Sequence, residues 1–67
     1  MPFRNYTRFT TETLRAMTAA YDAVVARLKL KPADPRTGKL AILIVQLTDA
    51  GVVDPEKLAD QARVGLK

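Results

Sequence analysis

The sequence predicts an all-α protein built from three helices, over about residues 10–29, 34–50 and 54–65. Three observations predict this class. Apolar residues recur at helical spacing in each segment, and the second and third segments each open on an Asp-Pro pair. The hydrophobic fraction is 48%, but only 6% of residues are aromatic, which is typical of an aliphatic helical core. Residues 10–67 form one predicted helical domain, and residues 1–9 precede it as an arm.

The first helix is predicted from its start signal and its apolar stripe. Thr10 can accept a hydrogen bond as N-cap, and Phe9 and Leu14 stand at the two positions of a hydrophobic staple. The helix should run to about Lys29, because a basic residue suits the negative end of the helix dipole. The predicted core face consists of Leu14, Met17, Tyr21, Val24 and Leu28, broadened by Val25.

Alanines mark the opposite side of this helix. They are Ala16, Ala19, Ala23 and Ala26. Small side chains would let another helix approach closely, which is one interpretation. The other, which we favour, is that alanine is the best helix former at positions that nothing contacts.

The second and third helices share the same type of start. Asp34 and Asp54 are predicted N-caps, each followed by a proline at the first helical position. The second helix should stop before Gly51 in a left-handed conformation, with Val52 folding back on Leu47 as in a Schellman motif. Val53 and Leu58 are the predicted staple of the third helix, whose thin apolar stripe is Leu58, Ala62 and Leu66. Short connectors between three such helices predict an antiparallel arrangement.

The run from Leu40 to Val45 carries more apolar surface than one helix face can hold. One stripe is Leu40, Leu43, Ile44 and Leu47, while Ile42 and Val45 point roughly the opposite way. The polar residues available for an exposed arc are Lys39, Gln46, Thr48 and Asp49. We therefore expect a partner chain on the second face, and a homodimer first. The predicted interface is Ile42 and Val45, rimmed or covered by Phe3, Tyr6 and Phe9.

Composition favours association over chemistry. A chain of 67 residues is marginal without disulfides, metals or association, and it contains no Cys. His and Ser are absent too, so the common nucleophile and base arrangements cannot form. No carboxylate pair, metal-ligand spacing or phosphate-binding glycine loop is evident. We therefore expect a non-enzymatic protein with no catalytic residue, no cofactor, no metal and no small-molecule substrate, either a homodimer or a small subunit or adaptor of another protein.

The net charge of +4 suggests an alternative function. Residues 1–31 carry six basic and two acidic residues, whereas residues 32–67 carry five of each. A basic arm before a Thr-capped helix resembles the ribbon-helix-helix repressors, whose paired N-terminal strands enter the major groove of DNA. The resemblance implies a dimeric DNA-binding regulator with Arg4, Tyr6 and Arg8 contacting bases. Two features depart from that family, namely a first helix close to 20 residues long and an arm without apolar alternation.

A second resemblance covers most of the chain. The stretches AYDAVVARL and GVVDPEKL look like parts of short uncharacterised bacterial helical proteins. This resemblance implies a three-helix cytoplasmic protein and carries no activity with it. No apolar run approaches the roughly 20 residues of a membrane span, and no targeting signal opens the chain, so we expect a soluble protein of the cytoplasm that does not bind membranes.

Overall fold

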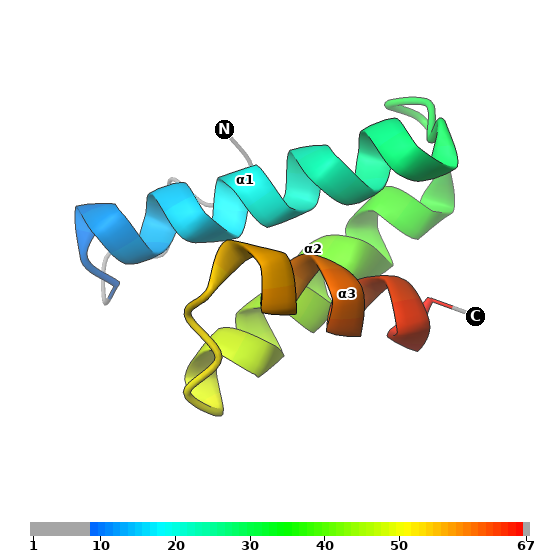
Figure 1. The fold of residues 1–67 in the computed structure, drawn as a ribbon. Coiled ribbons are helices and arrows are strands. Elements are labelled where there is room, and N and C mark those ends of the chain that lie inside the picture. Colours follow the sequence, from blue (N-terminus) through cyan, green and yellow to red (C-terminus); the bar gives the residue numbers. More distant parts are fainter. Residues whose placement is uncertain (1–8, 67) are drawn as a thin grey trace.

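The computed structural model describes residues 9–66, and three helices make up most of this range (Figure 1). They are α1 (Thr11–Leu28), α2 (Pro35–Asp49) and α3 (Pro55–Gly65). No strand occurs in the described range. The all-α prediction and all three helices are therefore confirmed, each with bounds within one residue of those expected. Most of the predicted arm lies outside the described residues.

Each helix begins on the predicted N-cap. The cap side chain has extended backbone geometry and accepts a hydrogen bond from a backbone N–H of the first turn, which would otherwise lack a partner. The three bonds are Thr13 N–H to Thr10 Oγ1 at 3.2 Å, Arg36 N–H to Asp34 Oδ1 at 2.9 Å, and Glu56 N–H to Asp54 Oδ1 at 2.9 Å.

Helices α1 and α3 point the same way and pack side by side, and α2 runs back in the opposite direction, passing behind α3 in the view of Figure 1. Each helix contacts the other two. The core between them consists of Met17, Ala20, Val24, Leu30, Leu40, Ile44, Leu58 and Ala62. The thin apolar stripe of α3 is sufficient to pack this helix against the core, because Leu58 and Ala62 are both fully buried.

The end of α1 differs from the prediction. Leu28 is 36% exposed and stands outside the core, whereas Leu30, which follows the helix, is only 6% exposed. Lys29 adopts a left-handed conformation with φ 53°, and the Leu30 N–H then bonds to the Val25 carbonyl at 3.0 Å. This Schellman turn folds Leu30 back onto the core. Helical periodicity stops at the turn, so it could not identify Leu30.

The end of α2 follows the prediction. Gly51 has φ 103°, and the Val52 N–H bonds to the Leu47 carbonyl at 3.0 Å. Val52 packs against the core. The predicted staple at Val53 is wrong, because Val53 is 55% exposed, and the chain uses the preceding valine to cover the core instead.

Thr48 was expected to help fill the exposed arc of α2, and it is buried instead. Its hydroxyl donates to the Ile44 carbonyl at 2.8 Å, one turn earlier in the same helix. This internal bond satisfies the hydroxyl, so the threonine can be covered without leaving a polar group unpaired. The polar residues left on the exposed arc are Lys39, Gln46 and Asp49.

Candidate interaction surfaces

The structure separates the predicted interface residues. Ile42 is 57% exposed on the outer side of α2. Val45 and Phe9 are half-buried and pack against the core of their own chain. Phe3 and Tyr6 lie outside the described residues, as do the predicted DNA contacts Arg4 and Arg8. Of the two apolar residues that suggested a second face on α2, Ile42 is the one that is mostly exposed.

An apolar groove lies next to Ile42, between α2 and α3. It encloses about 550 Å³, and its apolar lining residues are Leu43, Leu47 and Val64. Val64 is 61% exposed. The two helices approach closely at Gly65, where an added Cβ would stand 3.2 Å from Leu43 Cδ1. The polar Gln46 lines the same groove and lies one turn after Ile42, so Ile42 stands just beyond the edge of the groove along α2.

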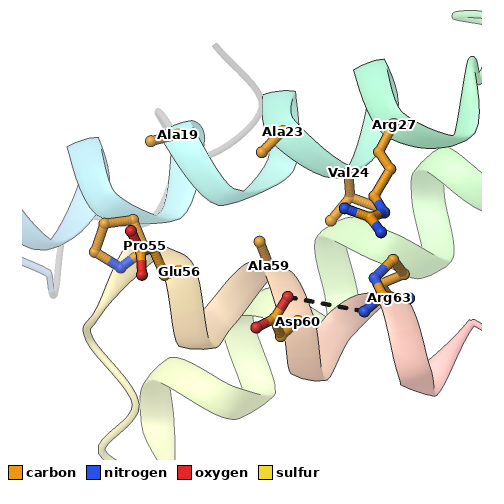
Figure 2. Close-up of a pocket in the computed structure, with 9 residues that line it drawn as sticks. All are labelled: Ala19, Ala23, Val24, Arg27, Pro55, Glu56, Ala59, Asp60 and Arg63. Atoms are coloured by element: carbon orange, nitrogen blue, oxygen red, sulfur yellow. Dashed lines mark ion pairs between the residues drawn. The ribbon is translucent and has the colours of Figure 1, made fainter.

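A second groove runs between α1 and α3 (Figure 2). It encloses about 500 Å³, and its walls include Ala19 and Ala23 from α1 and Ala59 from α3. Two members of the alanine face therefore stand beside another helix of the same chain. Of the other two, Ala16 packs against the core and Ala26 is exposed. The groove is open because these side chains are too short to fill it.

The charges of this second groove are separated along its length. Figure 2 shows Glu56 at the end where α3 begins, and Arg27 and Arg63 together at the other end. Asp60 lies between them and forms a long ion pair with Arg63, at 3.8 Å between carboxylate oxygen and guanidinium nitrogen. The Asp60 side chain is 75% exposed, so water screens this pair strongly.

A third hollow, of about 400 Å³, lies where α1 and α3 end and α2 begins. Its lining is Arg27, Leu28, Arg36, Arg63 and Leu66, so each helix contributes one arginine. Arg36 is held by Asp34, with Nη2 to Oδ2 at 2.8 Å and Nε to Oδ1 at 3.1 Å. The Arg36 side chain and backbone N–H donate to the Asp34 carboxylate and lower its pKa to about 2, from the ordinary 3.8. Asp34 is thus both helix cap and arginine anchor.

The described residues hold no group of three or more His, Cys, Asp or Glu side chains that could bind a metal ion. Within the same range, no helix has the length and apolar character needed to span a bilayer.

No protein-family model, curated protein or solved structure matches this chain. The geometry of the surfaces is therefore the basis for the functional argument. Sequence reasoning found Ile42, which the structure leaves exposed, but missed Val64 and the meeting of three arginines. Both depend on how the helices are placed against one another, and a single helical period carries no signal for that placement.

Proposed function

We propose that this protein acts by protein–protein association, without catalysing a reaction, and that its first partner is a second copy of the same chain. The contact is the outer face of α2. The observation that supports it best is the 57% exposure of Ile42 beside the apolar groove between α2 and α3. Adjacent exposed apolar residues of this kind are typical of protein interaction sites.

The outer face of α2 is complementary to itself. Its exposed residues Lys39, Ile42, Gln46 and Asp49 follow spacings of three, four and three, which places them in one row along the helix. In an antiparallel pair of α2 helices with a two-fold axis between Ile42 and Gln46, Lys39 faces Asp49 of the second copy. Two-fold symmetry then forms this ion pair twice. Opposite charges at the two ends of one row support self-pairing over an unrelated partner.

The first test is a measurement of mass in solution by size-exclusion chromatography with light scattering, over a series of concentrations. The proposal expects a dimer near twice 7.4 kDa that dissociates on dilution. Ile42→Glu should give a folded monomer, because each copy would bring an unpaired charge into the contact. Val53→Glu is the matched control, since Val53 is equally exposed but lies outside α2. It should leave the dimer unchanged.

A charge exchange tests the antiparallel register. Lys39→Glu and Asp49→Lys should each weaken the homodimer, because each places like charges opposite one another. Mixing the two variants should restore association, since in the mixed dimer one ion pair forms with reversed sign and the other forms as in the wild type. The double variant should also dimerise. A monomeric wild type, or mixed variants that stay apart although each is helical by circular dichroism, would contradict the proposal.

DNA binding is the second candidate function, and it is supported by the basic excess of residues 1–31. It would use Arg4, Tyr6 and Arg8 and require the dimer as its scaffold. Salt-sensitive binding to a DNA duplex that is lost in the Arg4→Ala, Arg8→Ala variant would favour it. Absent or salt-insensitive binding would count against it.

A further inference from the structure

The charges of the described residues are distributed unequally between the two ends of the molecule. Helices α1 and α3 finish at the end of the molecule where α2 starts (Figure 1). By their positions in the chain, the basic residues of this end are Arg27, Lys29, Lys31, Arg36, Lys39 and Arg63. Asp34 is the carboxylate at this end, and Asp60 lies on α3 one turn before Arg63. Asp49, Asp54 and Glu56 lie toward the opposite end. A positive end of this kind attracts anions.

Within this end, the three-arginine hollow has a defined geometry. Arg27 and Arg63 line both this hollow and the groove between α1 and α3, so their guanidinium groups lie at the boundary of the two. Figure 2 shows the Arg27 side chain reaching from α1 toward Arg63 on α3. Leu28 and Leu66 add apolar walls to the hollow. Two cationic groups thus converge on one partly apolar space.

The carboxylates of the described residues leave these two cations largely unbalanced. Asp34 is committed to Arg36 through short hydrogen bonds. Asp60 reaches Arg63 at only 3.8 Å and is mostly exposed. Among residues 9–66, no hydrogen bond or ion pair holds the Arg27 guanidinium. Two neighbouring positive charges repel, and an anion between them would remove that repulsion.

A role at helix ends explains part of this arrangement. Arg27 and Arg63 stand in the last turns of α1 and α3, where a basic side chain interacts favourably with the helix dipole. That role requires one cation at each helix end. It does not require the two side chains to face a common hollow, nor a third arginine from α2 held beside them by its own carboxylate.

We propose that Arg27 and Arg63, with Arg36 fixed beside them by Asp34, form a binding site for a dianionic phosphoryl group. The planar guanidinium donates paired hydrogen bonds that match phosphate oxygens. These two cations, of which only Arg63 has a long and exposed ion pair, match the nearly two negative charges of a phosphate monoester at neutral pH. A phosphodiester carries one charge and matches them less well. This site lies apart from the outer face of α2, so it adds a ligand to the proposed association.

The experiment is a titration of the full chain with methyl phosphate, followed by NMR at constant ionic strength. The proposal expects saturable one-to-one binding, with the largest shifts at Arg27, Leu28, Arg63 and Leu66. Arg27→Gln should weaken binding about tenfold, the size expected when a charge-assisted hydrogen bond is lost. Lys31→Gln removes the same charge from the same end without touching the hollow, and it should change the affinity less than twofold.

Two further measurements make the result decisive. Arg63→Lys keeps the charge and the aliphatic stem but loses the planar fork, so it should remain folded and still bind less tightly than wild type. Inorganic phosphate should compete with methyl phosphate, whereas dimethyl phosphate should bind at least several-fold more weakly. Equal binding of dimethyl phosphate would overturn the proposal and point to a nucleic-acid backbone. Equal losses in Arg27→Gln and Lys31→Gln, or the absence of saturation, would overturn it as well.

Discussion

The ends of α1 and α2 carry the same turn on different residues. Each closes with a Schellman motif, in which an apolar residue just beyond the helix folds back while its N–H bonds to a carbonyl five residues earlier. At α2 the left-handed residue is Gly51, and the residue that folds back is Val52. At α1 the left-handed residue is Lys29, and the residue that folds back is Leu30.

The difference shows which part of the motif determines the fold. Lysine pays a conformational penalty at positive φ that glycine does not, so the turn at α1 forms against local preference. Leu30 is 6% exposed, whereas Val52 is only half-buried. We infer that burial of the Leu30 side chain stabilises the turn at α1. At α2 the turn is favoured because glycine adopts positive φ without a steric penalty. Three substitutions test this comparison.

The largest effect is expected at the side chain that folds back in α1. Leu30→Ala should lower the free energy of unfolding by about 2–4 kcal/mol, because it leaves a cavity in a small core. Leu28→Ala, two residues earlier, should cost less than about 1 kcal/mol, since that side chain is largely outside the core. Urea denaturation followed by circular dichroism measures both. Equal losses would mean that Leu28 and Leu30 share the core face and that the turn matters little.

An intermediate effect is expected at the left-handed residue of α2. Gly51→Ala should destabilise the protein by about 1–2 kcal/mol, because an L residue is strained at φ 103°. Apart from the glycine and its two chain neighbours, no atom lies within 4 Å of the added Cβ, so the loss would measure backbone strain without a clash against the rest of the fold. Gly38→Ala is the control inside α2, where the Cβ is also free of contacts and alanine should stabilise the helix. A neutral Gly51→Ala would show that this turn does not need glycine.

The smallest effect is expected at the left-handed residue of α1, and it has the opposite sign. Lys29→Gly should raise the free energy of unfolding by about 0.5–1 kcal/mol, because relief of the strain exceeds the lost interaction of the lysine with the helix dipole. Lys31→Gly serves as the control, since it removes the same charge beyond the turn and should not stabilise the protein. Thermal unfolding at two salt concentrations separates the charge effect from the strain. Destabilisation by Lys29→Gly would mean that the charge matters more than φ.

The same comparison explains what the sequence could predict of the fold. Thr10, Asp34, Asp54 and Gly51 act through bonds to neighbours in the chain, so their residue type and position were enough. Leu30 and Thr48 depend on what covers them. Leu30 lies beyond the helical repeat, and Thr48 is polar by type but satisfied by its own helix. Leu30 was therefore missed and Thr48 misplaced, because tertiary packing overrode the local signal.

The candidate surfaces also divide into a part that the sequence could predict and a part that it could not. Ile42 was predictable as exposed apolar surface, because two sides of one helix cannot both face a small core. Val45 packs against that core, so the predicted patch was larger than the observed one. The three-arginine hollow draws one residue from each helix, and the residues are separated in the chain. Only the relative placement of the helices brings them together.

An odd number of helices has a mechanical consequence. Because α1 starts at one end of the molecule and α3 finishes at the other (Figure 1), a pulling force applied at these two points runs nearly along the helices. It would slide α1 past α3 and break their packing across the whole contact at once, instead of peeling the helices apart turn by turn. Force applied at these two points would therefore load the domain in shear.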